Sequence, residues 1–200
     1  WSAAWINTLE QEVGYFSVSD DIHDIKRKKI VIISSSFAEI NPAFIKKNVE
    51  LGKTIVIEKP SVSLASYFGI TLSKEEKAKK ITSGILNGLP LNCGIRHSSF
   101  DGFEVLMKID TNPAIISKNI GKGKIIFILF DYSKQLVSLQ QGVPESDYSV
   151  KHNHGILGME EPADLIYDKK FLDSNIPYAD ILEKFVIDLL PVPKWGKLPP

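Results

Sequence analysis

The sequence contains a single cysteine, no long apolar run and no excess of charge of either sign. One cysteine excludes an internal disulfide and any zinc site built from several cysteines. No stretch approaches the ~20 apolar residues of a membrane-spanning helix. The 24 Lys and Arg residues balance 24 Asp and Glu residues, whereas nucleic-acid modules usually carry a basic excess or stripe. We therefore expect neither a nucleic-acid partner nor a transmembrane segment.

What is present indicates one globular domain with a tail. Apolar residues make up 44% of the 200 residues, which is enough to bury a sizeable core. The chain begins inside an amphipathic helical pattern, so it reads as part of a longer protein. Residues 191–200 are rich in proline and suit an extended linker. We expect a domain over residues 1–190 and a linker over 191–200, with Trp195 anchoring the linker to this domain or to a following one.

Alternating strands and helices predict the fold class. Residues 29–34 and 54–58 are continuous apolar runs, typical of strands buried on both faces. Between them lies a helix over 40–52, which Asn41 caps and Gly52 ends. Strand, helix and strand at this spacing form a parallel unit. Three more strands follow, and a Gly-Lys-Gly turn makes the last two a hairpin; they cover 103–109, 114–119 and 124–131. The sequence thus predicts a three-layer α/β/α sandwich whose largely parallel sheet ends in an antiparallel hairpin.

The remaining segments give weaker signals. We expect a helix over 1–14, a short strand over 15–19, a helix that Ser61 or Ser63 begins and Gly69 ends, and a closing helix over 178–190. Charge pairs four residues apart, such as Glu75 and Lys79, favour a solvated helix over 71–82. Residues 83–102 and 140–162 read as loops.

Ligands in such sheets usually bind beyond the carboxyl ends of the parallel strands. Ser34, Glu58 and Ser61 lie at those ends and Asp131 ends a later strand, so these four are the candidate binding residues. Each also has a structural interpretation. Ser61 is well placed to cap the following helix, and Asp131 is well placed to cap the loop over 132–134.

Other reactive residues carry less weight. Cys93 and His97 could form a thiolate pair, although a lone cysteine is more often a small buried side chain. His152 and His154 have the spacing of a metal half-site, but they lie in the long polar stretch over 140–162, so we expect neither a metal nor a cofactor. Phe127, Phe130 and Tyr132 would stack on sugars if exposed and belong to the core if they face inward.

The motifs of the strands and helices resemble a known family. They are the strand Ile30–Ser34, the helix Asn41–Leu51, Gly52-Lys53-Thr54-Ile55-Val56-Ile57-Glu58, Leu64-Ala65-Ser66-Tyr67-Phe68-Gly69-Ile70, Pro113-Ala114-Ile115-Ile116 and Gly121-Lys122-Gly123-Lys124-Ile125-Ile126-Phe127 with Phe130-Asp131. Over residues 1–190 the chain is similar to class I glutamine amidotransferase-like domains, in the degenerate form fused to carbohydrate-active enzymes. It also resembles the domain that precedes polysaccharide deacetylase-type modules. The resemblance implies a flavodoxin-like sheet whose first strand precedes Trp1 and a neighbouring domain of the same chain as partner. The sequence leaves the compartment open, and an extracytoplasmic location is compatible with the resemblance.

Active members of that family place a cysteine or serine on a glycine-flanked elbow between a strand and a helix. Here the segment after 54–58 reads Glu58-Lys59-Pro60-Ser61, with no cysteine and no glycine, and Pro60 is expected to hold Lys59 extended. The late His-x-Glu pair is replaced by His152-Asn153-His154. We therefore expect no catalytic residues. Three hypotheses follow: a non-catalytic accessory domain of a polysaccharide-modifying protein, a binding module for glycan or another small ligand, and an atypical hydrolase or amidotransferase that uses Cys93 or Ser61.

Overall fold

The chain folds into an α/β domain around a mixed five-stranded sheet. The computed structural model describes residues 2–13, 15–35, 40–77, 81, 86, 88–89, 91, 93–141, 143–144, 167–168 and 177–192. Its helices are α1 (Ser2–Glu12), the 3-10 helix η1 (Ile22–Arg27), α2 (Pro42–Glu50), α3 (Val62–Tyr67), α4 (Tyr132–Gln141) and α5 (Tyr178–Asp188). Its strands are β1 (Ile30–Ile33), β2 (Thr54–Glu58), β3 (Ile70–Lys77), β4 (Gly94–Phe100), β5 (Glu104–Ile109), β6 (Asn112–Ile120), β7 (Gly123–Ile128), β8 (Val143–Pro144) and β9 (Tyr167–Asp168). None of the described helices is long and apolar enough to cross a membrane.

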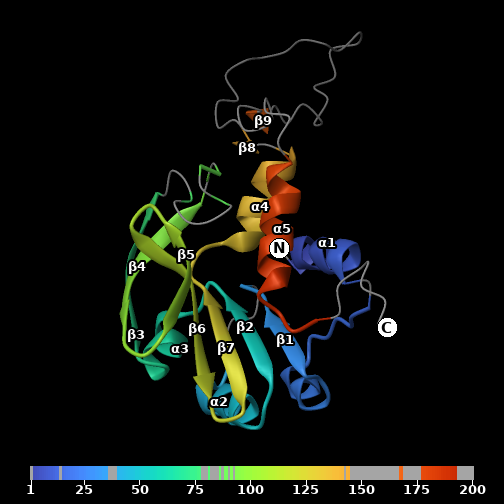
Figure 1. Ribbon diagram of the computed structural model, residues 1–200, viewed down its shortest axis with the longest axis vertical. Coiled ribbons are helices and arrows are strands. Elements are labelled where there is room, and N and C mark those ends of the chain that lie inside the picture. Colours follow the sequence, from blue (N-terminus) through green and yellow to red (C-terminus); the bar gives the residue numbers. More distant parts are fainter. Residues whose placement is uncertain are drawn as a thin grey trace, which may run out of the picture.

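The main sheet has the strand order β1-β2-β7-β6-β5 (Figure 1). β1, β2 and β7 run parallel to one another. β6 and β5 are antiparallel additions, joined to β7 through the turn at Gly121 and Lys122. The prediction of parallel strands followed by an antiparallel hairpin is therefore confirmed.

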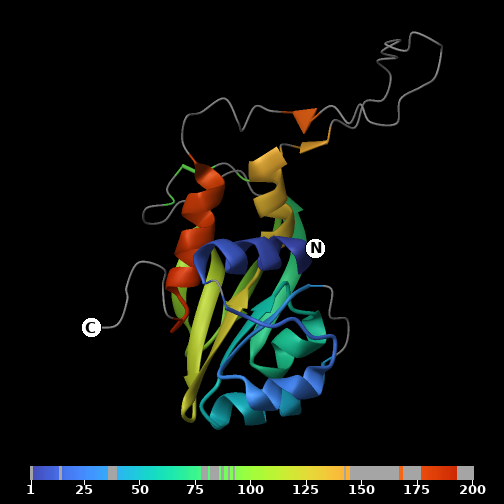
Figure 2. The same cartoon turned by 90° about the vertical axis from the view of Figure 1, so that its right-hand side faces the viewer.

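Two hydrophobic clusters lie on opposite faces of the sheet. α1, α4 and α5 cover one face, where Val56 and Ile126 meet Trp5, Tyr132 and Leu182. η1, α2 and α3 cover the other, where Ile55 and Phe127 meet residues such as Ile45 and Leu64. Figure 2 shows α1 lying across the sheet above η1 and α2. β2 is buried at every position because it lies inside the sheet with helices on both sides.

α2 lies between β1 and β2. It begins after Asn41 and ends before Gly52, as the sequence predicts. The Asn41 side chain accepts a hydrogen bond from the amide of Ala43 at 3.0 Å and caps α2. The C-terminal end of α2 packs against the β6–β7 turn, where the Lys122 amide donates to the Glu50 carbonyl. A Cβ at Gly123 would collide with the carbonyls of Val49 and Lys53. Glycine is therefore required there by close packing.

Several local predictions are wrong. Residues 70–77 form β3, which pairs antiparallel with β4, instead of the solvated helix expected over 71–82. β4 lies in the expected loop over 83–102. The charge pairs within the segment favour a helix, but the cross-strand pairs between β3 and β4 stabilise the strand more. In these pairs Ile70 lies opposite Phe100, and Glu75 lies opposite Arg96. The short strand expected over 15–19 is also wrong, since these residues form no regular secondary structure and pair with none of the described strands.

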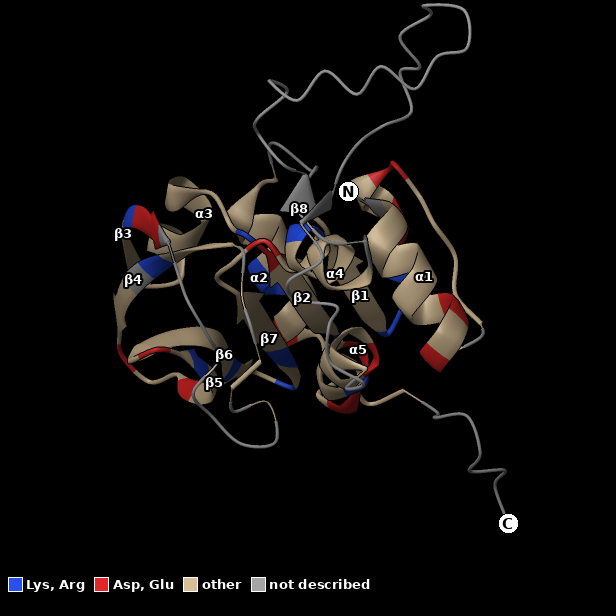
Figure 3. Ribbon diagram, turned by 90° about the horizontal axis from the view of Figure 1, so that it is seen from above, with Lys and Arg blue, Asp and Glu red and all other residues tan. Residues whose placement is uncertain are grey.

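Charge is spread over the surface in both signs. Figure 3 shows both basic and acidic residues at several places along the ribbon, without one sign dominating. The pattern agrees with the even charge balance of the sequence.

Candidate functional site

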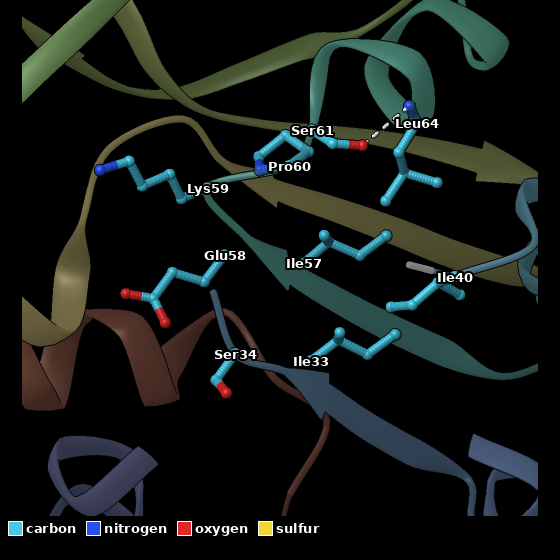
Figure 4. A pocket seen from close by; sticks show the side chains of 9 residues that line it. All are labelled: Ile33, Ser34, Ile40, Ile57, Glu58, Lys59, Pro60, Ser61 and Leu64. Carbon is cyan, nitrogen blue, oxygen red and sulfur yellow. Dashed lines mark hydrogen bonds between the residues drawn. The ribbon is translucent and has the colours of Figure 1, made fainter. Parts of the chain in front are cut away.

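The structure brings three of the four candidate binding residues together at the carboxyl end of the parallel strands. Ser34 follows β1, and Glu58 to Ser61 follow β2. They line a depression with the apolar side chains of Ile33, Ile40, Ile57 and Leu64 (Figure 4). Its volume is about 20 Å³, which has room for about one water molecule. Pockets for small-molecule ligands are roughly 300 Å³ or larger, so the depression cannot enclose a sugar ring.

Glu58 is buried and its carboxylate accepts four hydrogen bonds. The indole N–H of Trp5 donates to Oε2 at 2.8 Å and the Ser35 amide donates to the same oxygen at 3.4 Å. Ser133 donates twice, from its amide to Oε1 at 2.8 Å and from its hydroxyl to Oε2 at 3.1 Å. These donors replace the water that the carboxylate loses on burial. Glu58 therefore ties α1 and α4 to the end of β2 and has little capacity left for a ligand.

Lys59 occupies the turn from β2 into α3 with a left-handed backbone, φ +46°. The expectation that Pro60 holds it extended is wrong, because the chain must reverse sharply between the strand and the helix. The ammonium lies 3.4 Å from Asp131 Oδ2 and 3.7 Å from Glu75 Oε2. The strand-to-helix turn thus has a left-handed residue, and that residue is a lysine held between two carboxylates.

Ser61 and Asp131 act as helix caps. The Ser61 hydroxyl accepts from the Leu64 amide at 3.2 Å at the start of α3. Asp131 accepts from the Lys134 amide at 2.9 Å. Asp131 was expected to end a strand and cap a loop, but β7 ends at Ile128 and residues 132–141 form α4. Figure 4 shows Glu58, Lys59 and Ser61 leaving the turn in different directions, so they do not converge on one point.

The thiol and the aromatic candidates belong to the core. Cys93 is buried, and desolvation raises the pKa of its thiol to about 12. A thiol in this state is a poor nucleophile. Phe127, Phe130 and Tyr132 are also buried, so they do not present faces for sugar stacking.

The candidate metal ligands are not placed. His152 and His154 lie outside the described residues. Among the residues that are described, no group of three or more His, Cys, Asp or Glu side chains could hold a metal ion.

A second buried polar cluster lies between α1, α4 and α5, and sequence reasoning missed it. The Thr8 hydroxyl donates to the Ala4 carbonyl at 3.0 Å and lies 2.9 Å from the Tyr132 hydroxyl and 3.2 Å from Glu183 Oε1. Burial raises the pKa of the Glu183 carboxyl, and nearby Asp180 and Glu12 raise it further. Burial likewise raises the pKa of Tyr132. Thr8 and Glu183 sit on the inner faces of amphipathic helices, and this placement is the sequence signal that could have revealed them.

Comparison with known proteins gives structural likenesses only. No protein-family model and no curated protein matches the chain. An exo-beta-1,4-mannosidase from Opitutaceae bacterium strain TAV5 matches with 16% identity and a TM-score of 0.49 over 57% of this chain and 23% of that one. A beta-galactosidase from Rahnella sp. R3 matches with 14% identity and a TM-score of 0.49 over 69% of this chain and 26% of that one. A cytoplasmic protein from Salmonella typhimurium LT2 matches with 13% identity and a TM-score of 0.45 over 64% of this chain and 74% of that one.

The chain thus spans about a quarter of the length of the two glycoside hydrolases. Similarity at this level is a partial likeness of the backbone, and it carries no argument about function.

Proposed function

We propose that this chain is a non-catalytic accessory domain of a larger carbohydrate-active protein. In this proposal it is a degenerate class I glutamine amidotransferase-like domain with a flavodoxin-like sheet between two helical layers. The observation that carries the proposal is Lys59, which stands in the left-handed turn from β2 into α3 with φ +46°. Active relatives of the resembled family place a cysteine or serine at such a turn.

The chemistry around Lys59 supports a non-catalytic role. An ammonium between Asp131 and Glu75 has no lone pair with which to attack a carbonyl. Within the described part of the chain, the hydroxyl of Ser61 accepts from the Leu64 amide and bonds to the Ser63 hydroxyl, so its partners include no general base. Cys93 is buried with a raised pKa, so neither nucleophile of the atypical-enzyme hypothesis is activated.

The carbohydrate context rests on the family resemblance together with the proline-rich segment 191–200, which suits a link to a following module. The resembled domains precede polysaccharide-modifying modules. The accessory role would then be to brace or position a neighbouring domain of the same chain.

A glycan or small-ligand binding module is the second candidate. The observation in its favour is the ion pair of Lys59 and Asp131, whose side chains are 31% and 13% exposed at the carboxyl end of the sheet. A ligand there would have to lie on the surface, since the depression beneath holds about one water.

Two measurements test the proposal. The purified chain is assayed for turnover of glutamine and of p-nitrophenyl acetate, with Cys93→Ala and Ser61→Ala as matched variants. Turnover that either variant abolishes would refute the non-catalytic role. The chain is also titrated with millimolar oligosaccharides while amide NMR shifts are recorded. Shifts confined to Ser34, Glu58 to Ser61 and Asp131 would favour the binding module, and a flat titration favours the accessory role.

The carbohydrate half of the proposal needs a separate test. Sequencing of the gene on both sides of this segment shows what the parent protein contains. A reading frame that continues into a polysaccharide hydrolase or deacetylase module supports the proposal, and one with an unrelated neighbour contradicts it.

A further inference from the structure

Although the chain carries no net charge, basic side chains gather at the end of the sheet where the parallel strands begin. A run of cations ends directly before β1, Lys53 precedes β2, and a lysine stands on each side of Gly123 at the start of β7. Figure 1 shows this end at the bottom of the view, away from α4 and α5. We call the following residues the basic end: Lys26, Arg27, Lys28, Lys29, Lys53, Lys122 and Lys124.

Backbone contacts hold these segments together as one surface. The Lys53 ammonium donates to the carbonyls of Lys26 and Lys28 at 2.9 and 2.6 Å, so it fixes the end of η1 beside the start of β2. The Lys124 amide donates to the Lys53 carbonyl at 3.1 Å. Lys122 precedes Lys124 in the turn from β6 into β7. The cations of three separate segments therefore keep a fixed arrangement.

Few carboxylates compensate this charge. Among the described residues, none of the members of the basic end forms an ion pair with a carboxylate. Glu50 is the acidic residue at the end of α2, and it lies 3.7 Å from the Lys46 ammonium. Asp21 and Asp24 lie in the first part of η1 and accept hydrogen bonds from their own segment. The basic end thus produces a local positive potential in a chain of zero net charge.

An exposed leucine stands beside these cations. Leu51 is the C-cap of α2, two residues before Lys53, and it is 69% exposed. A hydrophilic polyanion, such as a nucleic acid or an acidic polysaccharide, would leave this side chain in water. An aliphatic side chain also gives no platform for the stacking of nucleic-acid bases. A lipid surface accepts both groups, because its headgroups attract the cations and its acyl region takes the leucine.

We propose that the basic end is a docking surface for a membrane that contains anionic lipids, into which Leu51 inserts. Each Lys or Arg near such a surface strengthens binding by about fivefold, and burial of a leucine side chain strengthens it by about tenfold. The strands then stand on the membrane by their amino ends, and the turn at Lys59 faces away from it. This inference goes beyond the accessory role and does not depend on it.

The test measures cosedimentation of the chain of residues 1–200 with sucrose-loaded vesicles. Vesicles of phosphatidylcholine alone are compared with vesicles in which about a third of the lipid is phosphatidylserine. We expect binding only to the phosphatidylserine vesicles at about 0.1 M salt. The binding should be lost near 1 M salt, where the Debye length falls from ~10 to ~3 Å.

Two charge-matched double variants locate the surface. Lys28→Gln with Lys122→Gln removes cations from two segments of the basic end and should weaken binding by about 25-fold. Lys134→Gln with Lys184→Gln removes the same charge from exposed positions on α4 and α5 and should leave binding unchanged. Lys53 is kept in both, because its ammonium holds η1 in place. Circular dichroism and thermal melting of each variant check that it is folded.

Leu51→Gln tests the insertion separately from the charge. It should weaken binding to phosphatidylserine vesicles by about tenfold. Val62→Gln, at a 54% exposed position on α3, is the matched control and should bind as the wild type does. Neither substitution should change binding to heparin or to polyuridylate, because a polymer in water offers no apolar phase.

No binding to phosphatidylserine vesicles, or equal binding to both kinds of vesicle, would overturn the proposal. Equal losses in the two double variants would also overturn it, because the basic end would then have no special part. Binding to polyuridylate or heparin without binding to vesicles would show that the surface takes a soluble polyanion instead. Wild-type binding by the Leu51→Gln variant would overturn the insertion of Leu51.

Discussion

Trp5 and Glu58, separated by 53 residues in sequence, are joined by a buried hydrogen bond of 2.8 Å from the indole N–H to the carboxylate. This bond attaches α1 to the carboxyl end of the central strand β2. The Trp5 ring also packs against Tyr132, with ring centroids 4.4 Å apart. One side chain thus connects α1, β2 and α4.

Trp5→Phe should lower the free energy of unfolding by about 2 kcal/mol, the typical worth of a hydrogen bond to a charged group. Phenylalanine keeps the aromatic contact with Tyr132 but lacks the N–H. Urea denaturation followed by circular dichroism measures the loss. Tyr15→Phe, at a 95% exposed position, is the control and should change nothing. In a Glu58→Gln background the cost of Trp5→Phe should shrink; full additivity would argue against the bond.

Lys59→Gly should be more stable than Lys59→Ala by about 1 kcal/mol, because glycine adopts a positive φ without steric cost. Both variants remove the ion pairs with Asp131 and Glu75, so their difference reports the backbone alone. The same two substitutions at the exposed Lys47 in α2 should give the opposite order, since alanine favours a helix interior. Equal stability of the two Lys59 variants would contradict the left-handed turn.

Stability should depend on pH through Glu183. Burial raises the pKa of this carboxyl above its ordinary 4.5, so the folded protein holds the proton more tightly than the unfolded chain. The contribution of Glu183 to stability is therefore fully present below pH ~4.5 and is lost as the pH rises through the folded-state pKa. Urea unfolding of the wild type and of Glu183→Gln should show that the variant lacks this loss. The exposed Glu10→Gln should retain the wild-type pH dependence, and identical profiles for all three proteins would contradict the prediction.

Cys93 should resist thiol reagents in the native protein. With its pKa raised to about 12, its thiolate fraction at pH 8 is about a thousandfold below that of an ordinary cysteine. Reaction with Ellman's reagent should be slow in buffer and fast in urea. A Tyr15→Cys, Cys93→Ser variant supplies an exposed thiol as the reference, and comparable native rates for the two thiols would disprove the buried state.

The sequence by itself determined the segments whose local signals and final environment agree. β2 spans the predicted residues 54–58. Its short β-branched run, bounded by Lys53 and Pro60, favours a strand and is too short for a helix. α2 begins at the predicted cap because the Asn41 side chain satisfies the first helical amide locally. Ser61 could be recognised as a cap for the same reason. α4 was overlooked, although Asp131 followed by Tyr132, Leu136 and Leu139 has the spacing of a capped helix.

Only the tertiary structure decided the rest, because those features depend on residues far apart in the chain. The charged segment 70–77 forms β3 because pairing with β4, which begins at Gly94, stabilises it more than the helix-favouring charge pairs within the segment would. Glu58 was a candidate ligand group, but in the fold Trp5, Ser35 and Ser133 donate hydrogen bonds to its carboxylate. It therefore connects helices to the sheet. Lys59 takes a left-handed backbone against its local preference because the fixed ends of β2 and α3 require a sharp reversal. Local patterns report the energy of a few neighbouring residues, whereas burial and strand pairing are set by the whole fold.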